Sequence, residues 1–406
     1  MISIRKMISK HSVVWLSVTV FLIALIIVVS VVATTVIPGL MDTMFGGERF
    51  EKVGGTGDNS YFTTDEGITD KASALAASNA LNEDICEEGF ILLKNNDRAL
   101  PLTGSEKISV FGKNSVNLAY GSSGSVGGDT DNAMTLFESL TAAGFAYNET
   151  LKGFYEDDSR SGSPRPDAPA MSDNALPDGF ATGETDPDTY PDDVLGSIDE
   201  FSDVALVVIS RTSGENSDLP TTMKNTTGAM SENDHYLELD ENEQNMLKLA
   251  CETCEKVVLL VNSGTPIELG FLDAVADGDD TDIGYDFSSG VDAAFQIGLP
   301  GESGIAALGK LLKGEINPSG RTVDTYARDF MKIPAVENFS LKGISSLDSY
   351  TVGGAARDQW FIDYEESIYI GYRYFETRGE GNDEWYNANV VYPFGYGLSY
   401  TTFSQE

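Results

Sequence analysis

The chain has 406 residues, and its 64 Asp and Glu against 26 Lys and Arg give a formal net charge of −38. So acidic a chain lacks the basic surface that would neutralise a phosphate backbone, which excludes nucleic acid as a partner. Hydrophobic residues make up 41% and aromatic residues 10%, enough for a large core, so overall disorder is also excluded. A structural zinc site needs four Cys or His ligands together. With three Cys and two His, of which His11 lies beside an apolar run, we expect none.

Residues 13–40 form a long apolar run after a basic start. No Lys, Arg, Asp or Glu lies between Lys10 and Asp42. About 28 residues at 1.5 Å each exceed the ~30 Å of bilayer hydrocarbon, and a cleaved signal peptide has a shorter apolar region. Arg5 and Lys6 precede the run. By the positive-inside rule, we expect an uncleaved single-pass anchor in the cell membrane, with a cytoplasmic N-terminus and an extracellular domain.

The next segments predict a linker and then a series of regular elements. Residues 43–68 are Gly-rich and polar, which is typical of a linker, and Thr69 and Asp70 offer N-cap chemistry for a helical pattern over 72–91. Apolar, β-branched runs predict buried strands at residues 108–112, 204–209, 257–261 and 291–297. Helical spacing is found at residues 134–143, 241–254, 267–276 and 304–312.

Strand runs that are apolar on both faces and alternate with helices predict an α/β fold, a three-layer α/β/α sandwich with a mostly parallel sheet. We assign it to residues 69–340, with functional sites expected at the carboxyl ends of the strands. Residues 156–200, dense in Asp, Pro, Gly and Ser, predict a surface excursion with little regular structure. Residues 341–406 are predicted to form a β-rich extension, with β-hairpins over the aromatic stretch 360–403.

One candidate for chemistry follows the predicted strand 204–209. Glu215 lies on a loop just beyond this buried strand, where a carboxylate can project from the domain, and Gly214 lets the backbone turn beside it. Arg211 and Asp218 are predicted to position or tune this carboxylate. Taken alone, a Glu on a loop is most often a solvated surface residue, and spacing does not overturn that reading.

A second candidate is the Gly-rich loop at residues 120–129. It has neither a G-K-[ST] ending nor a G-x-G-x-x-G that opens a helix, so we do not expect nucleotide binding. A close approach to a sugar or protein surface is favoured instead. Ser122, Ser123 and Asp129 are therefore candidates for contact with a substrate.

Other reactive side chains are interpreted as non-catalytic. There is no G-x-S-x-G motif, and His235 lies in a polar stretch typical of a surface residue. Cys251 and Cys254 lie three residues apart in a helical pattern, which indicates packing thiols rather than a redox pair.

Several motifs in a consistent order resemble the α/β sandwich domain of family 3 glycoside hydrolases of the β-glucosidase type. They lie at residues 87–95, 100–102, 261–268, 298–302, 314–321, 369–374 and 392–400. The resemblance runs from about residue 72 to residue 403. It implies retaining hydrolysis of terminal β-D-glucosides in carbohydrate metabolism, with no metal or organic cofactor.

The resemblance also implies a division of the catalytic residues. The nucleophilic Asp of this family belongs to a (β/α)8 barrel and the general acid/base Glu to a sandwich loop. The acid/base motif falls on residues 213–218, so Glu215 inherits that role. Asn216 departs from the usual Gly and leaves the local backbone conformation open, although Asn tolerates left-handed geometry better than most residues.

The 406 residues contain no eightfold strand–helix repetition and no Ser-Asp-Trp-type nucleophile motif. An anchor followed directly by the sandwich resembles family members with reversed domain order, in which a fibronectin-III-like domain and then the barrel follow. We therefore expect a fragment or natural remnant, inactive alone, whose barrel acts in cis or in trans. The alternative is a non-catalytic, membrane-anchored carbohydrate-binding or interaction module that uses residues 121–129 and the aromatic C-terminal segment.

Overall fold

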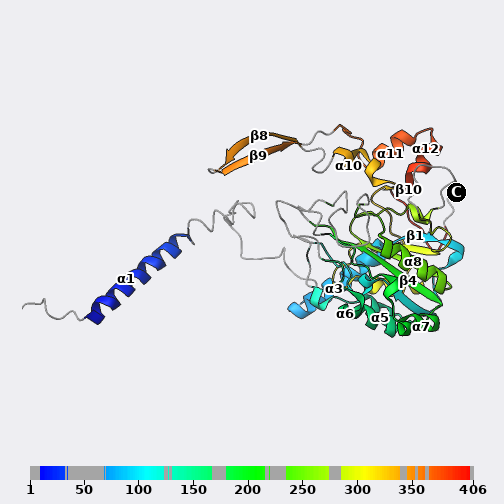
Figure 1. Ribbon diagram of the computed structural model, residues 1–406, viewed down its shortest axis with the longest axis horizontal. Helices are drawn as coiled ribbons and strands as arrows, with labels where there is room; N and C mark the ends of the chain where they lie inside the picture. The colour runs from blue at the N-terminus through cyan, green and yellow to red at the C-terminus, as the bar shows by residue number, and fades with distance from the viewer. Residues whose placement is uncertain are drawn as a thin grey trace, which may run out of the picture. The chain divides into compact units, whose positions relative to one another are not determined.

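The computed structural model divides into two compact units, residues 1–67 and residues 68–406 (Figure 1). The structure describes residues 10–32, 34, 68, 70–122, 127, 130–166, 180–214, 219, 235–273, 285–338, 345–352, 355–361 and 365–402. The first unit contains helix α1 (Lys10–Val31). Among these described residues, no helix combines the length and the apolar character needed to span a bilayer. The anchor predicted for residues 13–40 is therefore not supported, and the predicted linker 43–68 lies outside the described residues except for its last residue.

The second unit is built on a six-stranded sheet with the order β1-β6-β5-β4-β2-β3. Its strands are β1 (Ile91–Asn95), β2 (Lys107–Phe111), β3 (Ala146–Tyr147), β4 (Val204–Arg211), β5 (Val257–Ser263) and β6 (Ala293–Gln296). All neighbours pair in parallel except β1, which pairs antiparallel with β6. The four predicted strands and the mostly parallel sheet are confirmed, whereas β1 and β3 were not predicted.

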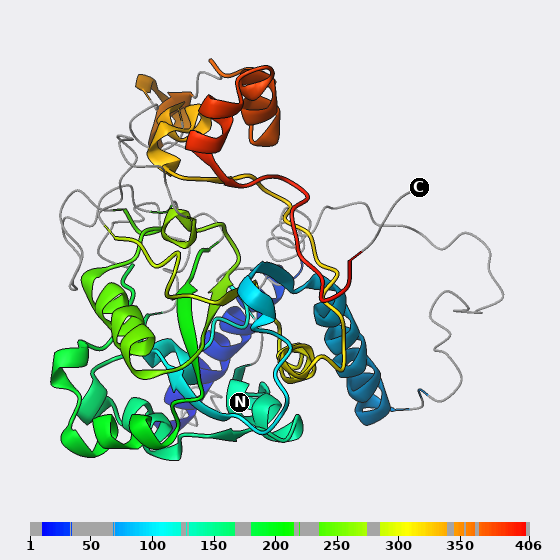
Figure 2. The same ribbon diagram turned by 90° about the vertical axis from the view of Figure 1, so that its right-hand side faces the viewer.

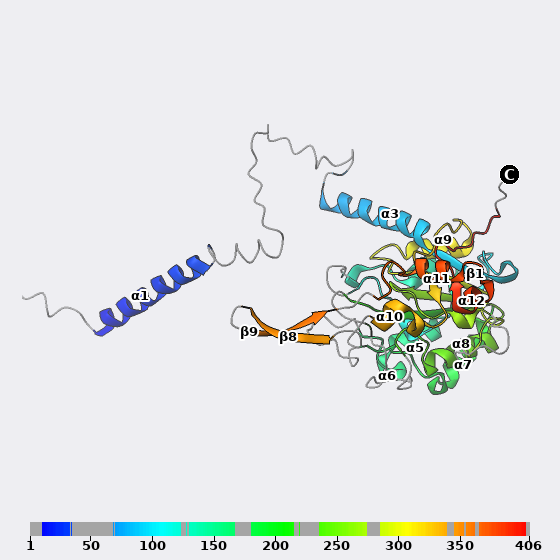
Figure 3. The same ribbon diagram turned by 90° about the horizontal axis from the view of Figure 1, so that it is seen from above.

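Helices cover both faces of the sheet, which confirms the predicted three layers (Figure 3). They are α3 (Lys71–Gly89), α4 (Leu136–Ala142), α5 (Glu149–Glu156), α6 (Asp158–Ser161), α7 (Asp192–Glu200), α8 (Glu241–Thr253) and α9 (Ala306–Lys313). On β4, Ala205, Val207 and Ile209 belong to a core cluster with side chains of α5, α7 and α8. The alternate residues of β4 pack in a second cluster with α4 and α9. Because the central strands β4 and β5 are buried on both faces, their sequences are nearly continuous apolar runs.

Helix α3 begins where the sequence predicts. The Asp70 carboxylate accepts a hydrogen bond from Ser73 N at 2.8 Å, and the Ser73 hydroxyl in turn accepts one from the Asp70 backbone N–H at 3.1 Å. This reciprocal pair is a capping box that satisfies backbone donors at the helix start. The predicted N-cap at Asp70 is confirmed, and the helix ends at Gly89, just before β1.

The predicted helix over residues 267–276 is wrong for its described part. Residues 267–273 contain only the short 3-10 helix η10 (Gly270–Leu272), and residues 274–276 lie outside the described residues. Ile267, Leu269, Phe271 and Leu272 are all buried in the core. Burial on more than one side of the backbone leaves no polar helix face, so the apolar spacing did not indicate an amphipathic helix here.

The segment 156–200 contains more regular structure than predicted. It includes α6, the 3-10 helix η9 (Pro187–Thr189) and the nine-residue helix α7. Val194 and Ile198 are buried, four residues apart on one face of α7. This short apolar stripe packs in the same cluster as Leu151 and Phe154 of α5, which explains why an otherwise acidic sequence is helical.

The predicted β-hairpins over residues 360–403 are wrong for most of that stretch. A hairpin of β8 (Ser345–Val352) and β9 (Ala355–Phe361) precedes it, but α11 (Tyr372–Gly379) and α12 (Asp383–Asn389) follow. Tyr374 and Phe375 on α11 pack on Trp385 of α12 with ring centroids 5.9 and 6.3 Å apart. Arg378 lies over the same indole at 4.9 Å. Arg378 lies three and four residues after these two aromatic side chains, so all three share one face of α11. The aromatic composition had indicated strands for this segment.

The chain then returns to the sandwich. Strand β10 (Val390–Tyr392) pairs antiparallel with β7 (Tyr326–Ala327), and the segments around them run side by side (Figure 2). Thr322 N donates to Tyr396 O at 2.8 Å, and Leu398 N donates to Leu92 O at 2.7 Å. The C-terminal motif at 392–400 is therefore part of the sandwich domain. The remaining short helices are η4 (Asn96–Arg98), η5 (Lys113–Val116), η7 (Thr130–Asn132), η11 (Phe330–Lys332) and α10 (Pro334–Asn338).

Candidate active site

The candidate site lies at the carboxyl ends of the parallel strands, where an α/β sheet opens to its loops. The loop that bears Glu215 leaves β4 directly after Arg211. Residues 215–218, which include Asp218, lie outside the described residues, as do Ser123 and Asp129. Among the site residues predicted from the sequence, the structure therefore describes Arg211 and Ser122, together with the residues at the base of both loops.

The structure brings the two predicted loops together. The Ser122 hydroxyl donates a hydrogen bond of 2.5 Å to Ser213 O, two residues before Glu215. On its other side, the Gly-rich loop meets the 298–302 motif, because Gly301 N donates to Tyr120 O at 2.8 Å. Motifs from three distant parts of the sequence thus border one another at the carboxyl edge of the sheet.

A buried amide holds this edge together. Asn262, on β5, has no exposed surface and uses both ends of its side chain. Its Oδ1 accepts from Ala119 N at 2.7 Å and from the Ser210 hydroxyl at 2.9 Å, and its Nδ2 donates to Ala119 O at 3.0 Å and Gly298 O at 2.7 Å. It thereby ties the ends of β4 and β6 to the start of the Gly-rich loop. Asn262 belongs to the family motif at residues 261–268, which suggests no role for it, and the local signal is a single amide at the end of an apolar strand.

Arg211 is buried at the base of the Glu215 loop. Its guanidinium pairs with the Glu243 carboxylate through Nη1 at 2.6 Å and Nη2 at 2.7 Å, and both side chains are almost fully buried. Nε donates to Tyr236 O at 2.6 Å, Nη1 to Ser210 O at 2.9 Å, and Nη2 to Glu238 O. Its described donors are therefore all directed to the protein. Arg211 can act on the loop through the backbone that it holds.

Two further carboxyl groups are buried beside this pair. Glu184 accepts hydrogen bonds from Lys113 N at 3.0 Å and Thr185 N at 2.9 Å, yet burial raises the pKa of its carboxyl to about 8. Burial, together with the nearby Glu243 carboxylate, raises the pKa of Asp240 to about 7. Such groups take part in the protonation equilibria of the fold at neutral pH. Their burial and their hydrogen bonds to the protein argue against a role as nucleophiles.

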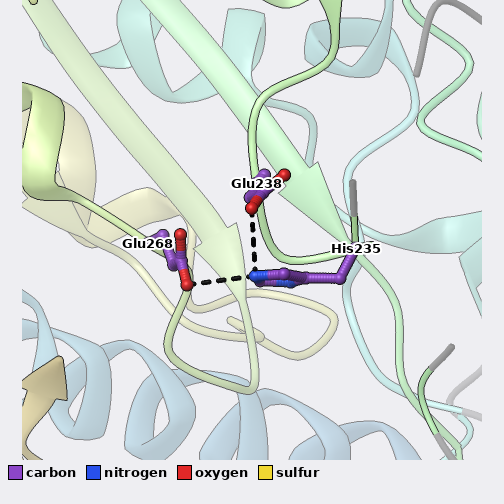
Figure 4. Close-up of side chains that lie close together, drawn as sticks. All are labelled: His235, Glu238 and Glu268. Atoms are coloured by element: carbon purple, nitrogen blue, oxygen red, sulfur yellow. Dashed lines mark hydrogen bonds and ion pairs between the residues drawn. The ribbon is translucent and has the colours of Figure 1, made fainter. Parts of the chain in front are cut away.

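His235 forms a cluster with Glu238 and Glu268, and these are the described residues that could hold a metal ion (Figure 4). The His235 Nε2 lies 3.0 Å from Glu268 Oε1 and 3.3 Å from Glu238 Oε1. Leu237 N donates to Nδ1 at 3.3 Å, so the proton of the neutral ring is on Nε2, the atom that faces the carboxylates. The Nε2–H of His235 therefore lies between two carboxylates that accept hydrogen bonds from it. Glu268 also accepts from Phe330 N at 2.6 Å, which joins three segments of the chain.

The interpretation of His235 as a surface residue is wrong. The residue is only 4% exposed; burial opposes its protonation, but the hydrogen bond that Nε2 donates to Glu268 outweighs this and raises the pKa of His235. Polar neighbours in the sequence misled the interpretation, because the partner Glu268 is 33 positions away. Cys251 and Cys254 are free thiols whose pKa burial raises to about 11, which agrees with their interpretation as packing residues.

Comparisons with known proteins agree with this architecture. Residues 90–400 match the family model of the glycosyl hydrolase family 3 C-terminal domain. The chain is 29% identical over 364 residues to Beta-glucosidase A of Butyrivibrio fibrisolvens, which covers 85% of this chain and 38% of the relative. It is also 29% identical over 325 residues to a beta-glucosidase of Ruminococcus albus, covering 79% of this chain and 28% of that protein.

Solved structures show the same similarity. A beta-glucosidase from Paenibacillus barengoltzii is 25% identical, with a TM-score of 0.58, over 80% of this chain and 30% of that one. Beta-glucosidase 3B from Thermotoga neapolitana, solved in complex with glucose, is 25% identical, with a TM-score of 0.57, over 81% of this chain and 39% of that one. The chain thus spans about a third of the length of these relatives. Because the family model covers most of its length, the chain belongs to glycosyl hydrolase family 3 and carries the C-terminal domain of that family.

Proposed function

We propose that this chain is the acid/base-bearing domain of a retaining β-glucosidase that hydrolyses terminal β-D-glucosides. The observation that carries the proposal is the family match over residues 90–400, combined with the position of the Glu215 loop at the carboxyl end of β4. Glu215 is the proposed general acid/base. The β-glucosidase names of the relatives support the substrate class, and they describe proteins more than twice as long as this chain.

Retaining hydrolysis requires a second carboxylate. It must lie about 5–5.5 Å from the acid/base and attack the anomeric carbon while the acid protonates the leaving oxygen. Three described carboxyl groups near Arg211, those of Glu184, Asp240 and Glu243, are buried and hydrogen-bonded to the protein. We therefore propose that the nucleophilic Asp comes from a (β/α)8 barrel, in cis or in trans, and that this chain alone does not turn over substrate.

The surrounding residues have proposed roles in this reaction. Ser122, Ser123 and Asp129 are suited to hydrogen-bond sugar hydroxyls from the Gly-rich loop. The contact of Ser122 with Ser213 O supports a position of this loop beside Glu215. Arg211 supports the loop from below through its bonds to Ser210 and Tyr236, and Asp218 is proposed to tune the acid.

The test compares two aryl β-glucosides, with the chain alone and with a separately produced family 3 barrel. We expect no turnover by the chain alone and a gain on addition of the barrel. Glu215→Gln should abolish the gain in kcat/KM for a poor leaving group and spare much of the gain in kcat/KM for dinitrophenolate, which leaves without protonation. Turnover, kcat, should fall for both substrates, because the same residue acts as the base when water hydrolyses the glycosyl-enzyme. Glu241→Gln, an exposed carboxylate at the start of α8, is the matched control.

Two outcomes would contradict the proposal. Hydrolysis by the chain alone that is lost in Glu215→Gln would place a nucleophile within these 406 residues. An equal gain with wild type and Glu215→Gln on the poor leaving group would remove Glu215 from the role of acid.

The second candidate function is a non-catalytic carbohydrate-binding module. It is favoured by the Gly-rich loop, which is suited to a sugar surface and whose described end is held at the edge of the sheet by the hydrogen bond from Ser122 to Ser213 O. Saccharide binding without hydrolysis, even with a barrel present, would support it.

The extracellular location of the domain rests on the basic residues before the apolar run at 13–40. We propose it on that sequence argument alone. Digestion of the domain by protease added to intact cells would support this location, and full protection would contradict it.

A further inference from the structure

Tyr236 is a fully buried residue, 24 positions after Thr212 in the sequence, that contacts the start of the Glu215 loop. Its hydroxyl accepts a hydrogen bond from Thr212 N at 3.2 Å and lies 3.4 Å from Thr212 Oγ1. Its backbone carbonyl accepts from Arg211 Nε at 2.6 Å, and the Arg211 guanidinium lies over its ring at 5.4 Å. One residue thus contacts both the last residue of β4 and the first residue after it.

The ring of Tyr236 belongs to a small apolar cluster that also holds the other side of the loop. It packs on Phe180 with ring centroids 5.1 Å apart, and Leu219 packs against the cluster that these two rings form. Glu215 lies three residues after Thr212 and four residues before Leu219. The stretch that carries Glu215 is therefore attached at both ends to one aromatic pair, by a polar contact at Thr212 and an apolar contact at Leu219.

Tyr236 is itself held by the residues on either side of it. His235 Nε2 donates to Glu268 Oε1 at 3.0 Å, and Glu268 N donates to Leu237 O at 2.9 Å. Glu268 belongs to the segment that follows β5. Because these bonds tie the backbone before and after Tyr236 to that segment, the position of the ring is set by the sheet and not by the loop.

The position of a general acid matters more than that of an ordinary loop residue. In a retaining glycosidase the two carboxyl groups lie about 5–5.5 Å apart. A misplacement of about 1 Å can cost roughly a hundredfold in rate. Releasing one end of a loop lengthens the free stretch of chain and increases its conformational freedom. An acid on such a loop spends less time where it can protonate the leaving oxygen.

From these contacts we propose that Tyr236 is a positioning residue for the general acid/base. Its hydroxyl fixes the start of the loop at Thr212, and its ring, together with Phe180, fixes the far side at Leu219. This inference rests on the proposed role of Glu215. It adds to that role a residue that acts on the loop itself, beside the support that Arg211 gives through the backbone.

The test removes these contacts one at a time and measures kcat/KM of the 406-residue chain with the separately produced barrel. Tyr236→Phe removes the hydroxyl and keeps the ring, and Leu219→Ala removes the apolar contact. Each should lower kcat/KM roughly tenfold for the aryl β-glucoside with a poor leaving group and less than about twofold for the dinitrophenyl β-glucoside, because only the first needs the acid. A general folding defect would lower both values equally.

The matched control is Tyr285→Phe. The Tyr285 hydroxyl accepts from Leu239 N at 3.3 Å, and its ring packs on Phe271 and Phe287, so the same atom is removed without a loss of contact to Thr212 or Leu219. Hydrogen exchange of the Thr212 amide in the chain alone gives a second readout that needs no barrel. Exchange should be about tenfold faster in Tyr236→Phe than in wild type, and unchanged in Tyr285→Phe.

The two measurements separate a failure of this inference from a failure of the proposed hydrolysis. If wild type with the barrel shows no turnover, the proposed hydrolysis fails, and exchange at Thr212 still decides whether Tyr236 holds the loop. The positioning role is overturned if Thr212 exchanges equally fast in Tyr236→Phe and wild type. It is also overturned if Tyr236→Phe, with an active barrel, lowers kcat/KM equally for both glucosides or for neither.

Discussion

Replacing Arg211 by Met would test whether the base of the Glu215 loop depends on a buried ion pair. Arg211 and Glu243 are 1% and 0% exposed, and two hydrogen bonds of 2.6 and 2.7 Å join them. The substitution keeps an unbranched side chain of similar reach but removes the charge. It leaves the Glu243 carboxylate buried without its cation, beside the raised-pKa carboxyl of Asp240.

The expected cost follows from that unpaired charge. Removing one partner of a buried ion pair typically destabilises a protein by roughly 3–5 kcal/mol, because the remaining ion has lost both water and its counter-charge. Replacing both partners by apolar residues is far less costly. Glu243 also caps α8 by accepting from Asp240 N at 3.0 Å, which adds roughly 1 kcal/mol to the cost of any change at that position. We therefore expect Arg211→Met/Glu243→Met to be more stable than Arg211→Met.

The assay is denaturant unfolding of the chain at pH 7, followed by circular dichroism, for wild type, both single variants and the double variant. Lys152→Met is the matched control, since it breaks a partly exposed pair with Glu156 that should contribute less than about 1 kcal/mol. The reasoning is refuted if Arg211→Met costs no more than Lys152→Met, or if the two single effects add in the double variant.

Three further predictions concern the same edge of the sheet. At Gly112, φ is +106° and an added Cβ would lie 2.6 Å from Val208 O, so Gly112→Ala should lower the melting temperature clearly more than Gly381→Ala, where φ is +71° and the space is open. Asn262→Leu should lower the free energy of unfolding by about 3 kcal/mol or more, because it leaves several buried backbone groups unpaired. A loss below about 1 kcal/mol in urea titration would contradict the role of Asn262 in holding this edge of the sheet together. The Glu184 carboxyl has a pKa of about 8 in the folded state against an ordinary 4.5, so the folded chain binds a proton that the unfolded chain has already lost between these values. Stability should therefore fall as the pH rises from about 5 to 8, and Glu184→Gln should reduce this fall; an unchanged pH profile in the variant would show that other groups cause it.

Some features could be predicted because their signal is local. The runs at 204–209 and 257–261 are apolar throughout because the strands are buried on both faces, and a continuous run of that length is readable without any partner. Asp70 and Ser73 form their capping box within three residues, so the start of α3 was equally readable. The family motifs extended this to the domain type, whereas the role of Glu215 stays a prediction.

The C-terminal aromatic segment shows where local signals are ambiguous. Tyr374, Phe375 and Trp385 have side chains that are common in strands, and composition alone favoured hairpins. Their packing as two helices depends on contacts between residues ten and eleven positions apart. An aromatic segment whose spacing fits both a strand and a helix is therefore assigned only when the tertiary contacts of its side chains are known.

The roles of polar residues at the edge of the sheet depended on long-range contacts. His235 looked solvated among polar neighbours, whereas its partner Glu268 lies 33 positions away, and Asn262 reaches Ala119 across 143 positions. A charged or amide side chain is stable in a core only when the fold supplies its partner, and the same residue type without that partner would be on the surface. The burial of apolar residues can be predicted from the sequence, because it depends on each residue's own side chain. The partner of a buried polar group can be identified only when the order of the strands in the sheet is known.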